Sequence, residues 1–133
     1  MVNRIAICDD VEVERFVLKR QLMVYFQTNG REAQIQEYES GESLLADIEE
    51  VYIWPDLIFL DIYMNGINGM ETARKIRLWD TSCHIIFVTT SSDFAVDSYE
   101  VKATYYLIKP TTEEQVSKAL DRCNPVSYTH LTL

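Results

Sequence analysis

The sequence lacks any long apolar run. No uninterrupted hydrophobic segment approaches the roughly 20 residues that a membrane-spanning helix needs. Residues 1–4 lead directly into a strand-like segment and not into the apolar core of a signal peptide. We therefore expect a cytoplasmic protein with no membrane partner.

Cysteine is scarce as well. The three cysteines, Cys8, Cys83 and Cys123, are far apart and form no CxxC pair. This spacing excludes the common zinc-binding and dithiol redox motifs. Cys8 and Cys83 lie in or beside apolar runs, so we expect them to be small buried side chains in a reduced compartment.

Positive charge is outnumbered by negative charge. The chain has 12 Lys and Arg residues against 21 Asp and Glu residues, for a formal net charge of -9. Such a surface repels the phosphates of nucleic acid. If the protein regulates a gene, another domain must contact the DNA.

The length and composition are typical of one globular domain. The chain has 133 residues, of which 47% are hydrophobic and 25% charged. Four short runs rich in Ile, Val, Leu and Phe are typical of strands in a parallel sheet that is covered on both faces. They span residues 5–8, 57–60, 85–88 and 105–108, and a weaker alternating segment at 35–38 is typical of an edge strand.

The segments between these runs have helical spacing of apolar residues. The expected helices span residues 11–28, 41–52, 69–79, 93–100 (short and weak) and 112–122. Strand and helix thus alternate five times, which predicts an α/β, doubly wound (βα)5 fold with a five-stranded parallel sheet and helices on both faces. Residues 124–133 break the pattern, so we expect a domain over 1–123 followed by a linker stub or a non-native tail.

Polar residues directly follow four of the apolar runs: Asp9 and Asp10, Asp61, Thr89, and Lys109. In open α/β sheets the functional site lies beyond the carboxyl ends of the strands, so these side chains should meet. Three adjacent carboxylates stay ionised together if a divalent cation binds among them, and oxygen ligands suit Mg²⁺. Lys109 and Thr89 are suited to contact a phosphate, and Asp61 to attack phosphorus.

Each of these residues has a simpler explanation when it is taken alone. An aspartate after a strand is usually a turn or capping residue, and we expect Asp10 to cap helix 11–28 as well as to bind metal. The combination at successive strand ends makes the functional interpretation the better one.

These motifs resemble the response regulator receiver domain over about residues 3–122, which has the flavodoxin-like fold. The resemblance implies the following assignments: Asp9 and Asp10 as metal-binding acids, Asp61 as the phosphorylated aspartate, Thr89 and Tyr106 as the switch pair, Lys109-Pro110 as the conserved lysine with a cis proline, and Gly69 as the loop glycine.

The resemblance also implies Mg²⁺ as the cofactor, with Asp9, Asp10, Asp61 and the backbone carbonyl of Tyr63 around it. It further implies that Thr89 and Tyr106 change the surface of helix 93–100, strand 105–109 and helix 112–122. The chain departs from the family at Met64-Asn65, where Met-Pro is usual. The missing proline calls the rigidity of that loop into question.

The stretches 93–110 and 120–123 resemble receivers that precede a LytTR-type DNA-binding domain. The implied partners are a sensor histidine kinase, the protein's own output domain, which this chain lacks, and a second copy on phosphorylation. The implied role is signalling by a phosphoacceptor and not enzymatic turnover of a separate substrate.

Three other functions compete with the phosphoacceptor role. A flavodoxin would need a phosphate-binding loop rich in Ser, Thr and Gly after the first strand, where this chain has Asp9-Asp10-Val11-Glu12. An aspartate-based phosphatase would need a second Asp at the position of Tyr63. A stand-alone receiver that acts only by binding other proteins is the remaining alternative.

Overall fold

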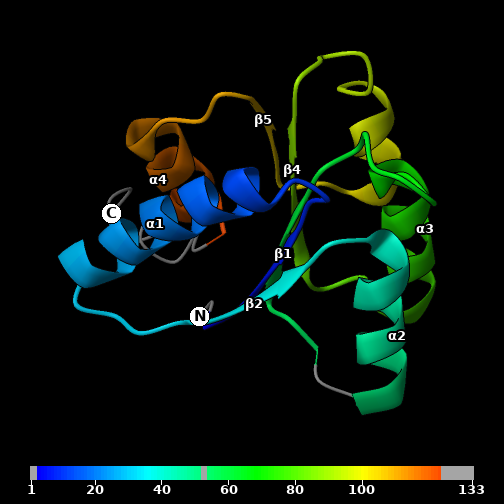
Figure 1. The fold of residues 1–133 in the computed structure, drawn as a ribbon, viewed down its shortest axis with the longest axis horizontal. Helices are drawn as coiled ribbons and strands as arrows, with labels where there is room; N and C mark the ends of the chain where they lie inside the picture. The colour runs from blue at the N-terminus through cyan, green and yellow to red at the C-terminus, as the bar shows by residue number, and fades with distance from the viewer. Residues whose placement is uncertain (1–2, 52–53, 124–133) are drawn as a thin grey trace, which may run out of the picture.

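The computed structural model describes residues 3–51 and 54–123. Five parallel strands form one sheet in the order β2-β1-β3-β4-β5, with helices on both faces (Figure 1). The strands are β1 (Arg4–Cys8), β2 (Gln34–Tyr38), β3 (Leu57–Leu60), β4 (His84–Thr89) and β5 (Tyr105–Ile108). The predicted doubly wound fold is confirmed, and β2 lies at an edge as expected.

Alternation along the strands divides the interior into two cores. Ile5 and Ile7 of β1 face the helices α1 (Glu12–Thr28) and α4 (Glu113–Arg122), whereas Ala6 and Cys8 face the opposite side. On that side the helices α2 (Gly41–Val51) and α3 (Gly69–Trp79) cover the sheet. Both faces of β3 are therefore buried, which explains why its sequence is an uninterrupted apolar run.

Polar side chains cap the first turns of α2, α3 and α4. Ser40 accepts a hydrogen bond from the Ser43 amide at the start of α2. Thr112 forms a capping box with Gln115 at the start of α4, and Asn68 forms one with Glu71 at the start of α3. These caps place the loops that precede α3 and α4 at the carboxyl edge of the sheet.

The fourth connection differs from the prediction of a short helix over 93–100. It contains only a five-residue 3₁₀ helix, η1 (Asp97–Val101), which ends at Lys102 with a left-handed φ of 53°. The Ser98 hydroxyl donates to the Ala95 carbonyl, a local bond that competes with regular helix hydrogen bonding. Short connecting segments of this kind commonly adopt 3₁₀ geometry.

All three cysteines are buried and free, so the predicted burial of Cys8 and Cys83 is confirmed. Within the described part of the chain, no helix is long and apolar enough to span a membrane. The predicted linker or tail at 124–133 lies outside the described residues.

Candidate functional site

The carboxyl ends of β1 and β3 bring three carboxylates together. Oxygens of Asp9, Asp10 and Asp61 all lie within 4.8 Å of one another. Asp9 and Asp61 are each only 5% exposed. The β1–β3 pairing places Cys8 beside Leu60. Asp9 and Asp61 directly follow these two residues, so the pairing brings their carboxylates together.

Lys109, the residue after β5, reaches into this acidic cluster. Its Nζ lies 2.7 Å from Oδ2 of Asp9, 3.2 Å from Oδ2 of Asp61 and 4.0 Å from Oε2 of Glu14. Burial alone would lower the pKa of Lys109, but the hydrogen bond to Asp9 and the charges of Asp61 and Asp9 outweigh it, so the pKa is raised. The raised pKa keeps Lys109 positively charged at neutral pH, beside Asp61.

Burial dominates the environment of Asp61. It raises the pKa of this carboxyl above its usual value, and the charge of Lys109 offsets the effect only in part. Oδ1 of Asp61 accepts the Ile62 amide at 2.8 Å, while Oδ2 faces Lys109. Gly69 allows α3 to approach closely, since a Cβ there would lie 2.1 Å from the Asp61 carbonyl oxygen.

Replacing Asp61 by asparagine is expected to stabilise the metal-free fold. The raised pKa means that the ionised carboxylate is disfavoured in the folded state, so its cost is present at neutral pH and disappears as the pH falls through the raised pKa. Asp61→Asn should raise the free energy of unfolding at pH 7 by about 1 kcal/mol. Urea denaturation with chelator at pH 7 and in acid measures this. The variant should have a higher free energy of unfolding than the wild type at pH 7, and this difference should shrink in acid. A lower free energy of unfolding at pH 7 would contradict the interpretation.

Asp10 does not cap α1, contrary to the prediction. The N-cap position is Val11, which makes no side-chain capping bond, and its amide donates to Oδ1 of Asp9 at 2.9 Å. Oδ2 of Asp10 instead accepts the amide of Asn65 at 3.1 Å. The cause lies in the β3–α3 loop, which presents a backbone donor to Asp10 at the position where the family usually has proline.

Tyr63 lies in the same loop, two residues after Asp61, with 46% of its surface exposed. Its hydroxyl donates to Oδ2 of Asp93 at 3.2 Å, and its ring packs edge-on against Phe94 at 5.8 Å between centroids. The tyrosine side chain thus links the β3–α3 loop to the loop that follows β4.

Thr89 is the last residue of β4 and is fully buried. Its hydroxyl is the one buried side-chain polar atom without a hydrogen-bond partner among the residues that the structure describes. On the neighbouring strand, the half-buried Tyr106 donates from its hydroxyl to the Ser91 carbonyl at 2.6 Å. The Lys109–Pro110 peptide bond is cis, as the resemblance implied.

Two side chains of α1 support the site, although neither belongs to a recognisable motif. Nη1 of Arg15 donates to the Asp9 carbonyl at 2.8 Å, and its Nε pairs with Glu37 at 3.2 Å. Gln21 donates to the Thr111 carbonyl at 2.8 Å and accepts from the Thr111 hydroxyl at 2.7 Å. Only the fold shows that Arg15 reaches the backbone of the acid pair.

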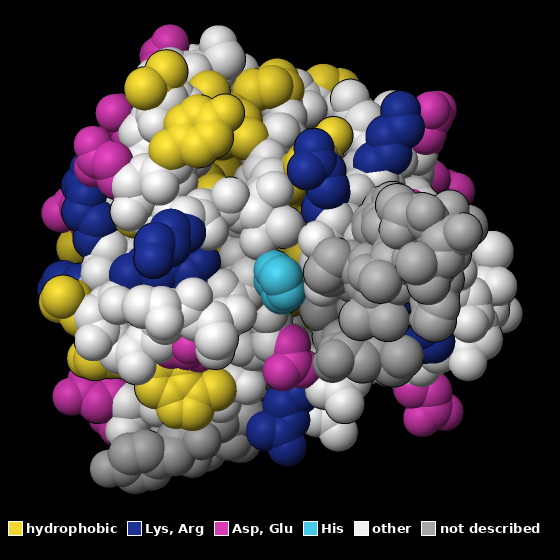
Figure 2. Space-filling model, turned by 180° about the vertical axis from the view of Figure 1, so that it is seen from behind, with side chains coloured by type: hydrophobic (Ala, Val, Ile, Leu, Met, Phe, Trp, Pro, Cys, Tyr) yellow, Lys and Arg dark blue, Asp and Glu magenta, His cyan; other side chains and the backbone are white. Residues whose placement is uncertain are grey.

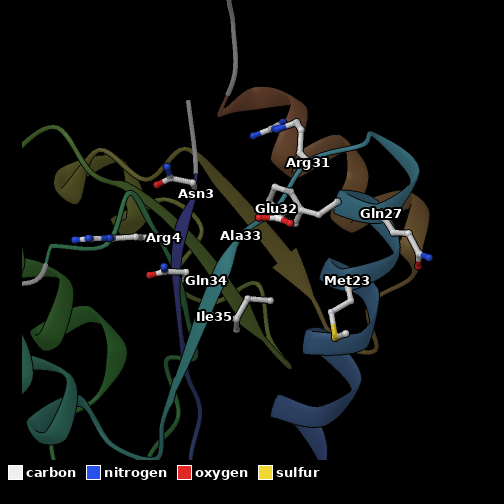
Figure 3. Close-up of a pocket in the computed structure, with 10 residues that line it drawn as sticks. Asn3, Arg4, Met23, Gln27, Arg31, Glu32, Ala33, Gln34 and Ile35 are labelled. Atoms are coloured by element: carbon white, nitrogen blue, oxygen red, sulfur yellow. The ribbon is translucent and has the colours of Figure 1, made fainter.

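A cavity lies at the other end of the sheet from the acidic cluster (Figure 3). It measures about 770 Å³, between the second half of α1 and the start of β2, and is lined by residues such as Arg4, Met23 and Gln34. None of the predicted site residues lines it. The acidic cluster is therefore the candidate site, and this cavity is separate from it.

Comparison with known proteins agrees with this geometry. Residues 5–121 match the model of the response regulator receiver domain. The sensory transduction protein LytT of Oceanobacillus iheyensis is 44% identical over 86 residues, which cover 63% of this chain and 34% of that protein. LytT of Bacillus subtilis is 29% identical over 93% of this chain and 49% of its own length. The chain thus spans half or less of the length of these relatives.

Among solved structures, response regulator TrrA of Thermotoga maritima, crystallised with Mg²⁺ and BeF, is 30% identical with a TM-score of 0.75. The match covers 91% of this chain and 98% of that one. The chemotaxis protein CheY4 of Vibrio cholerae has a TM-score of 0.76 at 24% identity, over 92% of this chain and 99% of that one, and supports the fold. The family match over nearly the whole described region, together with the acid cluster at the carboxyl edge of the sheet, shows that the chain belongs to the response regulator receiver domain family.

Proposed function

We propose that this receiver domain accepts a phosphoryl group on Asp61 from the phosphohistidine of a sensor histidine kinase, in a reaction that requires Mg²⁺. The observation that carries the proposal is the contact of the buried Asp61 with Lys109, beside two further carboxylates at the carboxyl edge of the sheet. A nucleophilic carboxylate, a cation for the phosphoryl oxygens and ligands for a metal are thereby present in one place.

The transfer is a simple exchange of bonds. An oxygen of Asp61 forms a bond to phosphorus while the bond from phosphorus to the donor's histidine nitrogen breaks. That nitrogen keeps the electron pair and takes a proton. Lys109 stabilises a phosphoryl oxygen with its fixed positive charge, and the domain turns over no separate substrate.

The residues present fit Mg²⁺. The cluster offers three carboxylate oxygens within 4.8 Å, and the nearby ammonium of Lys109 balances only part of their charge. Hard oxygen ligands are those that Mg²⁺ prefers, and it keeps water in its remaining positions. We assign Asp10, Asp61 and the Tyr63 carbonyl as ligands, with Asp9 in contact through water. When bound, the metal neutralises the charge that develops on the phosphoryl group.

Calorimetric titration with Mg²⁺ tests this assignment. Asp61→Asn and Asp10→Asn should each weaken binding by about tenfold or more, because each removes a charged ligand. Asp56→Asn is the control, since Asp56 lies at the opposite end of the sheet, where it accepts the amides of Asn3 and Arg4. Unchanged affinity in both site variants would refute the metal assignment.

The switch is proposed to run through Thr89 and Tyr106. A phosphoryl group adds strong acceptor oxygens, and the partnerless Thr89 hydroxyl is available to donate to one of them. Movement of Thr89 frees space beneath the loop that Tyr106 contacts at Ser91, so the ring turns further inward. Two packings biased by a ligand are what a switch requires.

The surface that changes comprises η1, β5 and α4. It carries exposed apolar side chains: Val96, directly before η1, is 78% exposed, Tyr99 80% and Ile108 39%. Figure 2 shows hydrophobic side chains gathered on the upper part of the rear face, where η1 and β5 lie. An apolar surface of this kind suits contact with a second copy or with an output domain.

We further propose that the domain works in the cytoplasm as part of a longer transcriptional regulator. Its relatives named LytT and LytR are two to three times as long as the matched region. A LytTR-type DNA-binding domain would supply the nucleic acid contacts that this acidic domain, with a net charge of -9, does not make.

A further inference from the structure

The β3–α3 loop contains no proline and includes residues that favour conformational freedom. Residues 62–68 read Ile-Tyr-Met-Asn-Gly-Ile-Asn, and Gly66 has a left-handed φ of 79°. Such a loop loses much backbone entropy when it is fixed in one conformation. Because it carries the Tyr63 carbonyl, its conformation matters to the proposed metal site.

Backbone amides of this loop are directed at three carboxylates in succession. The Ile62 amide donates to Asp61, the Asn65 amide to Asp10, and the Ile67 amide to Oε2 of Glu42 at 3.1 Å. Two of these acceptors belong to the acidic cluster. The third does not, because Glu42 comes from the first turn of α2.

Glu42 lies in a helical turn whose backbone is tightly packed, and its own side chain is exposed to solvent. Ser40 caps the helix, and Gly41 packs so closely that a Cβ there would lie 2.2 Å from the Thr72 hydroxyl and 2.9 Å from Ile67. An acidic side chain in a first helical turn is favoured by the helix dipole. The Glu42 carboxylate also packs against Gly66, where a Cβ would meet it at 2.4 Å.

We propose that Glu42 is a positioning residue for the metal site. By accepting the Ile67 amide it holds the β3–α3 loop, which carries the proposed Tyr63 ligand, in the conformation in which the Asn65 amide reaches Asp10. It thus supplies, from α2, the stiffness that a proline at position 65 would otherwise give. This inference rests on the proposed Mg²⁺ site.

The test is calorimetric titration of the metal-free domain with Mg²⁺ alone. Glu42→Ala should weaken binding by about tenfold, the scale on which partners that orient ligands act. Glu42→Gln removes the same charge but keeps an oxygen that accepts the Ile67 amide, so it should retain most of the wild-type affinity. Amide exchange of Asn65 and Ile67 in the metal-free protein should be faster in Glu42→Ala than in Glu42→Gln.

The outcomes separate the possible failures. Equal weakening in both Glu42 variants would mean that only charge matters and would overturn the positioning role. Wild-type affinity in Glu42→Ala, with Asp10→Asn still weakened, would overturn this inference while leaving the metal site intact. A wild-type domain that does not bind Mg²⁺ would overturn both.

Discussion

Asp61→Asn is expected to abolish phosphorylation of the domain by acetyl phosphate. Wild-type protein with Mg²⁺ should gain the mass of one phosphoryl group, and the variant should gain none over the same period. The reason is chemical: an amide oxygen is a far weaker nucleophile than a carboxylate, and Asp61 is the carboxylate in contact with Lys109. Intact-mass spectrometry with and without Mg²⁺ measures the difference.

Asp10→Asn provides the matched control. It removes one acid of the same cluster but leaves Asp61 and Lys109 in place. Phosphorylation of this variant should be slowed, and raised Mg²⁺ should restore part of the rate because the defect lies in metal affinity. Phosphorylation that persists in Asp61→Asn would place the nucleophile elsewhere.

Thr89→Ala is expected to disconnect phosphorylation from the η1–β5–α4 surface while leaving Asp61 able to accept the phosphoryl group. The Thr89 hydroxyl is buried and has no partner among the described residues, so its removal costs the resting state no hydrogen bond. What is lost is the donor that responds to the new phosphoryl oxygens. The stability of the resting domain should therefore change little.

Amide chemical shifts with and without beryllofluoride measure this effect. In the wild type, resonances of η1 and β5 should shift on addition of the mimic, and in Thr89→Ala these shifts should be largely lost. Thr89→Ser keeps the hydroxyl and should behave like the wild type. Equal responses in wild type and Thr89→Ala would show that the coupling through Thr89 and Tyr106 is wrong.

Much of the fold could be predicted because buried segments can be recognised in the sequence by their apolar residues. A strand covered on both faces has no polar position, so Leu57–Leu60 is apolar throughout and ends at Asp61. The capping residues Ser40 and Thr112 likewise mark helix starts by chemistry that is local to the chain. Parallel topology then brings the residues after β1, β3 and β5 to one edge.

The contacts around the site could not be predicted, because they join segments distant in sequence. Asp10 was expected to cap α1. Nothing near it in the sequence shows that its carboxylate instead accepts the Asn65 amide, 55 residues away. The same holds for Glu42, whose bond to Ile67 spans 25 residues. The 3₁₀ geometry of η1 was missed for a different reason, since periodicity alone does not distinguish one short helical turn from another.

The most direct measurement of the central claim identifies the residue that carries the phosphoryl group. Wild-type domain phosphorylated with acetyl phosphate and Mg²⁺ is reduced with borohydride, which converts an aspartyl phosphate to homoserine, and is then mapped by peptide mass spectrometry. Homoserine should appear at position 61, and its formation should require Mg²⁺. Homoserine at Asp9 or Asp10, or at no position in protein that has gained a phosphoryl group, would contradict the account.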